Sequence, residues 1–303
     1  MTDNLLLITN TLMYATPLIL AGLGGVISEK SGVVNLALEG IMTIGAFAAA
    51  AVAFATGNVW LGFFAAGAAG AMLALLHALS TVTFKADQTI SGVALNFVGP
   101  GLAIFFSRMF FGAVRSDPVQ VRFPRLAAVF PSLADSVFNF SFMFIIAFLL
   151  VIAMYIFLYK TKWGLRIIAI GEHPAAADTL GVNVNLTRFL CVIASGVLAG
   201  FGGAAFTLSI VSIFAPNVIA GAGFIALAAV IFGKWSPHGL LGACLIFGFF
   251  QALAIRLRGY DLPVPLQVIT IMPYILTIII LVLFVGKSVA PKAVGIPYKK
   301  GAH

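Results

Sequence analysis

Long apolar segments recur along almost the whole chain, and they constrain its fold more than any other feature of the sequence. A helix that crosses a lipid bilayer needs about 20 predominantly apolar residues, because no water is present to bind its backbone polar groups. The predicted spanning segments are residues 5–27, 33–56, 59–83, 90–111, 137–159, 188–212, 221–233, 238–255 and 265–286. A single cleaved signal peptide does not explain such a series. The expected fold is an all-α polytopic membrane protein with roughly 8–10 transmembrane helices.

The composition excludes a soluble domain. Of the 303 residues, 62% are hydrophobic and only 9% are charged, whereas about 25% of the residues in a typical soluble domain are charged. No connection between the apolar segments is long enough to bury a core of its own. We therefore expect one transmembrane domain over residues 1–303.

The basic residues predict how the chain is oriented in the membrane. The 17 Lys and Arg residues outnumber the 9 Asp and Glu residues, and most of the excess lies at the ends of apolar segments. This is the pattern of the positive-inside rule, so it does not indicate binding to nucleic acid. It places a connecting loop at about residues 160–187 and the C-terminal tail in the cytoplasm, with an extracellular loop at about 112–136. Nine spans would put the N-terminus outside, and ten would put it inside.

The stretch "SGVVNLALEG", residues 31–40, places polar groups between two apolar segments. If the chain is helical from Val34 onward, Asn35 and Glu39 lie one turn apart and share a face. A carboxylate is costly to bury in a membrane, which makes Glu39 a candidate functional residue by default. We expect both side chains to face protein or water.

A second polar series lies in "KADQTISGVALN". Gln88, Gly92 and Asn96 recur every four residues, so a helix would place them in one stripe. Gly92 would allow a substrate or a neighbouring helix to come close. Two interpretations remain open for both series: the residues line a translocation path, or they only form hydrogen bonds between helices and cap broken segments.

A short helix is predicted inside the loop of residues 160–187. Pro174 suits a first helical position, the alanines at 175–177 are strong helix formers, and Gly181 suits a terminator. A helix this short has marginal stability in water by itself. We therefore expect it to dock onto another surface. An ordinary interfacial connector is the alternative.

The chain carries no recognisable catalytic or metal-binding pattern. The histidines are scattered, no HExxH or GxSxG is present, and "VGKS" at residues 285–288 has Leu281 where a P-loop has its first glycine. Cys191 and Cys244 are expected to be inert packing residues. Gly196 and Gly200 form a GxxxG pair, which we interpret as tight helix packing and not as a dedicated dimer face.

Five blocks together resemble a known family. They are "SEKSGVVNLALEG", "KADQTISGVALN", "GEHPAAADTLGVNV", "SGVLAGFGGA" and "GFIALAAVIFGKWSPHG". In this order they are similar to the permease subunits of bacterial ABC importers for branched-chain amino acids, ribose and nucleosides, from about Leu20 to Gly286. The nucleoside branch, of the guanosine or purine nucleoside type, is the most similar. The "GGIDLS" element of the sugar branch is replaced here by "SGVVNLALEG".

The resemblance implies a non-catalytic transport subunit in the cell membrane. Its implied partners are a cytoplasmic ATPase that holds the ATP and magnesium, a second permease subunit that is expected to differ from this chain, and an extracellular substrate-binding lipoprotein. No cofactor is expected on this chain. The ATPase-coupling residues implied are Glu172, His173, Pro174, Ala176, Asp178 and Gly181. The segment "SGVVNLALEG" would interrupt a helix beside the translocation path, with Asn35 and Glu39 facing the interior of the protein.

Three other functions remain open from the residues. An ion-coupled secondary transporter would use Glu39 to hold the coupling ion near a broken helix. A passive channel would equilibrate its substrate without accumulating it. The same ABC architecture could also carry a simple sugar.

Overall fold

The computed structural model describes residues 3–128, 131, 139–259, 265, 267–269, 271, 274–275, 279 and 289–300. Within these residues the chain is helical apart from its connections and one isolated β-bridge between Arg125 and Ser141. The long helices are α1 (Asp3–Lys30), α2 (Leu38–Thr56), α3 (Val59–Ala78), α4 (Gln88–Phe111), α5 (Phe142–Lys160), α8 (Val184–Ala205) and α10 (Pro237–Leu257). The shorter ones are α6 (Lys162–Glu172), α7 (Pro174–Thr179), α9 (Ala222–Phe232) and the 3₁₀ turn η2 (Leu126–Ala128). Two π-helical turns, η1 (Leu79–Thr83) and η4 (Phe206–Val211), extend α3 and α8.

The predicted fold class, an all-α polytopic membrane protein, is confirmed. In the described part of the chain, seven helices are long and apolar enough to cross a membrane, and α9 is a shorter apolar helix. Most of the predicted segment 265–286, together with the "VGKS" stretch, lies outside the described residues.

Several of the predicted segments start at other residues in the structure. The segment predicted from residue 33 becomes α-helical only at Leu38, because residues 31–37 form turns and extended backbone. Asn35 therefore precedes the helix that carries Glu39, and the expectation that they share a helix face is wrong. The segment predicted from residue 188 begins earlier, at Val184, where the Asn183 side chain accepts a hydrogen bond from the Leu186 N–H and caps the helix.

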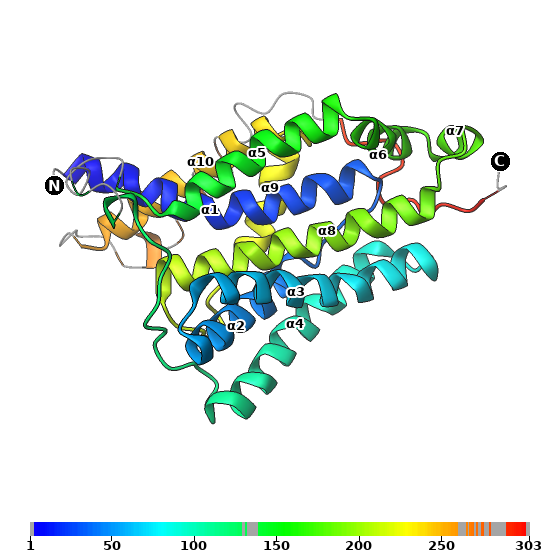
Figure 1. Ribbon diagram of the computed structural model, residues 1–303. Coiled ribbons are helices and arrows are strands. Elements are labelled where there is room, and N and C mark those ends of the chain that lie inside the picture. Colours follow the sequence, from blue (N-terminus) through cyan, green and yellow to red (C-terminus); the bar gives the residue numbers. More distant parts are fainter. Residues whose placement is uncertain are drawn as a thin grey trace.

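Small residues bring the central helices close together. α8 packs between α1 and α3 (Figure 1). A Cβ atom added at Gly200 would lie 2.2 Å from the Ala66 carbonyl oxygen, and one added at Gly196 would lie 2.2 Å from the Ala74 Cβ. The GxxxG pair thus serves contacts inside the subunit, as predicted.

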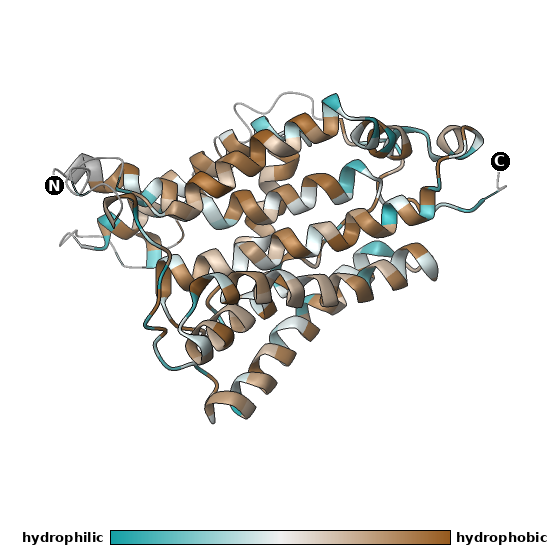
Figure 2. Ribbon diagram, viewed as in Figure 1, coloured by the Kyte–Doolittle hydropathy of each residue, from teal (hydrophilic) through white to brown (hydrophobic). Residues whose placement is uncertain are grey.

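The two ends of the helix bundle differ. The N-terminus lies at one end, while α6, α7 and the C-terminal segment 289–300 lie at the other (Figure 1). Hydrophilic residues gather toward both ends of the long helices and along the connection before α5, and the helix surfaces between are apolar (Figure 2). This distribution is what a membrane-spanning bundle requires.

Candidate functional site

Residues 31–37 interrupt the helical path between α1 and α2. The turn that begins this broken segment is closed locally: Ser28 Oγ donates to the Val33 carbonyl oxygen at 2.7 Å, and Ser31 Oγ donates to the Ser28 carbonyl oxygen at 2.6 Å. Gly32 has a φ of +93°, a backbone conformation that side chains disfavour. The serines and the glycine of "SEKSG" therefore explain why the helix stops there.

The polar stripe on α4 binds the backbone of the broken segment. Gln88 Oε1 accepts a hydrogen bond from the Val34 N–H at 2.7 Å, and Asn96 Nδ2 donates to the Leu36 carbonyl oxygen at 2.8 Å. Between them, a Cβ atom at Gly92 would lie only 2.7 Å from the Leu36 Cβ. The gap predicted at Gly92 is thus filled by the protein's own chain. The polar stripe on α4 thus gives the backbone groups of the broken segment the hydrogen bonds that they would otherwise form within a helix.

Asn35 and His77 complete the support of the segment from α8 and α3. The fully buried Asn35 donates from Nδ2 to Ser195 Oγ at 2.8 Å. His77 Nε2 lies 2.9 Å from the Val34 carbonyl oxygen, and Nδ1 lies 2.9 Å from Ser91 Oγ. Sequence reasoning treated His77 only as one of four scattered histidines. Its position in an otherwise apolar helix was the signal that could have found it.

Glu39 joins α2 to the first turn of α9. Its Oε1 accepts a hydrogen bond from the Gly221 N–H at 2.8 Å, and its Oε2 accepts one from the Gly223 N–H at 2.7 Å. These are unpaired donors at a helix N-terminus, where the helix dipole also favours a negative charge. A Cβ atom at Gly223 would lie 2.4 Å from the Glu39 nitrogen, so this close approach requires glycine.

The structure therefore brings together all five residues that the sequence predicted for the translocation path, around residues 31–40. Each of the four with polar side chains binds backbone or a serine of a neighbouring element. The described residues contain no group of three or more His, Cys, Asp or Glu that could hold a metal ion.

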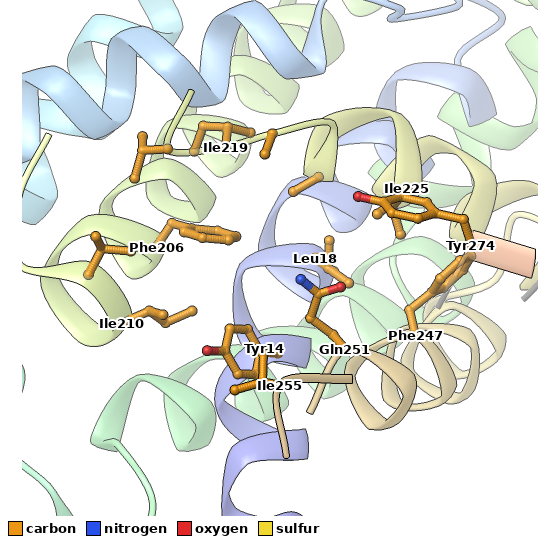
Figure 3. Close-up of a pocket in the computed structure, with 14 residues that line it drawn as sticks. Tyr14, Leu18, Phe206, Ile210, Ile219, Ile225, Phe247, Gln251, Ile255 and Tyr274 are labelled. Atoms are coloured by element: carbon orange, nitrogen blue, oxygen red, sulfur yellow. The ribbon is translucent and has the colours of Figure 1, made fainter. Parts of the chain in front are cut away.

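A cavity of about 240 Å³ lies beyond the Glu39 contact, between α1, η4, α9 and α10. Its lining is mostly apolar, with several aromatic side chains and the amide of Gln251 (Figure 3). None of the five predicted path residues lines it, but Ala220 and Ala222, which flank Gly221, do. Sequence reasoning missed this cavity because its described walls come from five separate parts of the chain, including Tyr274 beyond α10.

The predicted short helix in the connecting loop is present as α7. Pro174 is its first residue, and Gly181 follows its end with a φ of +80°. Glu172 ends α6, and His173 links the two helices. On α7 the Ala177 side chain is buried, whereas Ala176 is exposed.

The C-terminal segment packs beside α7, which the sequence did not predict. A groove of about 490 Å³ runs between residues 173–176 and residues 296–299. Asp178 Oδ1 lies 3.9 Å from Lys300 Nζ. The exposed face of this end of the molecule is therefore built from two distant parts of the chain.

Arg188 lies in the first part of α8 and is almost completely buried, with only 2% of its surface exposed. Its Nε donates to the Ser31 carbonyl oxygen at 3.0 Å and its Nη1 to the Ile296 carbonyl oxygen at 2.9 Å. Arg188 thus holds the start of the broken segment to the C-terminal segment.

Both cysteines are buried and form no disulfide, as expected for packing residues: Cys191 lies on α8 and Cys244 on α10. Glu29 is buried as well and accepts a hydrogen bond from the Trp235 indole N–H.

Comparison with known proteins identifies a family that the chain matches. The profile of the family described as branched-chain amino acid transport system / permease component matches residues 7–285. The chain is 43% identical to the guanosine ABC transporter permease protein NupQ of Bacillus subtilis, over 98% of this chain and 97% of the relative. It is 40% identical to the nucleoside ABC transporter permease protein NupC of Lactococcus lactis, over 97% of each. A Haloferax volcanii protein assigned as a glucose ABC transporter permease, TsgC13, is 37% identical over 84% of this chain and 79% of its own. No solved structure gives a significant match.

Proposed function

The chain belongs to the family of permease components of branched-chain amino acid transport systems, and we propose that it is the membrane-spanning permease subunit of an ABC importer for nucleosides. The observation that carries this proposal is the identity of 43% and 40%, over nearly the whole chain, to two permeases named for guanosine and for nucleosides. The relative named for glucose is less similar and covers less of the chain. A simple sugar is therefore the less favoured substrate.

The proposed complex contains three kinds of subunit besides this chain. A cytoplasmic ATPase holds ATP and magnesium, a second and different permease subunit completes the membrane part, and an extracellular lipoprotein delivers the nucleoside. This chain forms one permease domain over residues 1–303, binds no cofactor and catalyses no reaction. In this arrangement α6, α7 and the C-terminus lie on the cytoplasmic side, and the N-terminus lies outside.

The shape of α7 supports its role as the ATPase-docking element. Ala177 packs with Ile170 and Val184 in a small apolar cluster, which fixes α7 to its own subunit. Ala176 is exposed on α7, and Leu180, which directly follows the helix, has 84% of its surface accessible. A short helix with one anchored face and one exposed apolar side chain can transmit the motion of a bound ATPase as a rigid body.

A chain of close contacts runs from α6 to α9. A Cβ atom at Gly171 on α6 would lie 2.2 Å from the Lys30 carbonyl oxygen, directly before the broken segment. Residues 31–37 lead into α2, and Glu39 on α2 holds the start of α9. We infer that movement of α6 and α7 shifts the broken segment and α9 together. In this scheme the broken segment lies beside the translocation path. The residues that hold the segment in that place are Asn35, Gln88, Gly92 and Asn96.

Reconstitution tests the proposed function. The complete transporter in proteoliposomes should accumulate labelled guanosine only with ATP and the substrate-binding protein, and collapse of the ion gradients should leave uptake unchanged. Uptake that stops when the gradients collapse, with ATP still present, would instead establish an ion-coupled transporter. Equilibration without accumulation would establish a channel.

The docking role of α7 has its own test. Ala176→Glu should reduce the amount of ATPase that copurifies with the permease several-fold, because a bulky charge would stand in the contact. The control is Thr56→Glu, at an exposed position outside this end of the molecule. Unchanged copurification of the ATPase with the Ala176→Glu variant would refute docking on α7.

A further inference from the structure

The cavity beside α9 has the chemistry of a site for an aromatic ring. Its lining includes the rings of Tyr14, Phe206, Phe247 and Tyr274. The volume of about 240 Å³ is somewhat below the roughly 300–1,000 Å³ that small-molecule sites occupy, so it suits part of a small molecule, such as one ring system. Aromatic side chains bind nucleobases by stacking, whichever base is present.

Gln251 supplies a polar group to this apolar surrounding. Its amide points into the space between α1 and η4 (Figure 3). It makes no hydrogen bond to any residue that the structure describes. An amide offers a donor and an acceptor side by side, which is the pairing that the edge of a nucleobase presents. Gln251 is half-buried, so its amide is available to pair with the edge of a base that enters the cavity.

The lining also discriminates among the substrate classes of the family. No charged side chain of the described residues lines the cavity. Against these described residues a zwitterionic amino acid would find no partner of opposite charge. A sugar would meet mostly apolar side chains there, because the polar side chains among the described lining residues are Gln251 and the two tyrosines. A neutral molecule with one flat ring suits this surface better.

The wall of the cavity is held by Glu39. Ala220 and Ala222 line the cavity, and the Gly221 N–H between them donates to Glu39 Oε1 at 2.8 Å. Glu39 does not line the cavity, so its role is to position the wall. Phe206, which also lines the cavity, begins η4, a π-helical turn of a type that is frequent at functional sites.

We propose that this cavity binds the base of the transported nucleoside during translocation, with Gln251 hydrogen-bonding the edge of the base between the aromatic rings. The inference rests on the proposed nucleoside import and adds the site on the permease itself. The lining includes η4, which follows α8, and α8 runs from the end that holds α7 toward the end that holds the N-terminus (Figure 1). In the proposed orientation that end is the side where substrate arrives.

The test compares two substrates in the reconstituted transporter with its ATPase, second permease and binding protein. Guanosine and purine riboside differ in the exocyclic groups on the base edge. Maximal uptake rates are measured with the binding protein saturated, so that its own preference does not enter. Gln251→Leu should lower the ratio of guanosine uptake to purine riboside uptake about tenfold, because one specific hydrogen bond is lost.

Matched variants separate the site from general damage to the helix. Phe247→Leu lines the cavity and should reduce the uptake of both nucleosides several-fold, whereas Phe249→Leu, two residues away on the exposed face of α10, should leave both unchanged. An unchanged substrate ratio in Gln251→Leu, with wild-type guanosine uptake intact, would overturn the base-binding site alone. Absence of nucleoside uptake by the wild-type transporter would overturn the proposed function, and this inference with it.

Discussion

Asn96 on α4 binds the backbone of Gly40 on α2: its Oδ1 accepts a hydrogen bond from the Gly40 N–H at 2.9 Å. The other half of the same amide donates to the Leu36 carbonyl oxygen. One side chain thus satisfies two backbone groups that the broken helix leaves unpaired. Inside a membrane no water is available to form hydrogen bonds with such groups, so the Asn96 amide is needed to stabilise the fold.

Asn96→Leu should therefore destabilise the folded protein. Two backbone groups lose their hydrogen-bond partner. In membrane proteins one such hydrogen bond contributes no more than about 1–2 kcal/mol to the free energy of unfolding. We expect a lower midpoint of thermal unfolding in detergent and less protein in the membrane. Phe97→Leu, at an adjacent position that is 77% exposed, is the control. Equal thermal midpoints for the two variants would contradict this role of Asn96.

Glu39→Gln should lower maximal nucleoside uptake about tenfold, with the protein still in the membrane. The carboxylate accepts from two N–H groups, but a glutamine has only one oxygen, and its NH₂ group would face a second donor. The wall formed by residues 220–222 would loosen. Uptake is compared at equal membrane levels. Asp87→Asn is the control, because Asn preserves the helix cap that Asp87 provides to Ile90 while it also removes a charge. Wild-type uptake by Glu39→Gln would disprove the positioning role.

Gly200→Ala should reduce the yield of folded, monodisperse protein several-fold. The added methyl group would collide with the Ala66 carbonyl oxygen on α3, a backbone atom that cannot move away cheaply. Gly242→Ala on α10 is the matched control, because nothing lies within 4 Å of the added atom. That change should be neutral or slightly stabilising, since alanine favours a helix over glycine by about 1 kcal/mol. Size-exclusion chromatography of both variants measures the difference.

Arg188→Lys should release the C-terminal segment. The guanidinium reaches the Ser31 and Ile296 carbonyl oxygens at once, which a single ammonium group cannot do in the same geometry. We expect trypsin to cleave after Lys292 several-fold faster, as followed by mass spectrometry of the purified protein. Arg166→Lys changes an exposed arginine in the same way and serves as the control. Equal cleavage rates would show that Arg188 does not hold the segment.

The sequence by itself determined the architecture and the family. Apolar segments of spanning length require helices, whatever their packing, because a lipid-exposed backbone has no other way to pair its polar groups. The local chemistry of Pro174 and Gly181 was likewise sufficient for α7, since helix starts and stops depend on neighbouring residues. The stripe of Gln88, Gly92 and Asn96 was also visible, because a helical period places them on one face.

Only the tertiary structure decided what these residues contact. The stripe binds the chain at residues 34–40, Glu39 contacts a helix that lies more than 180 residues away, and Arg188 joins the broken segment to the C-terminal segment. The cavity around Gln251 is a further case, because its described walls come from five separate parts of the chain. Hydrogen bonds between distant segments depend on how whole helices pack, and no local pattern in one sequence records that geometry.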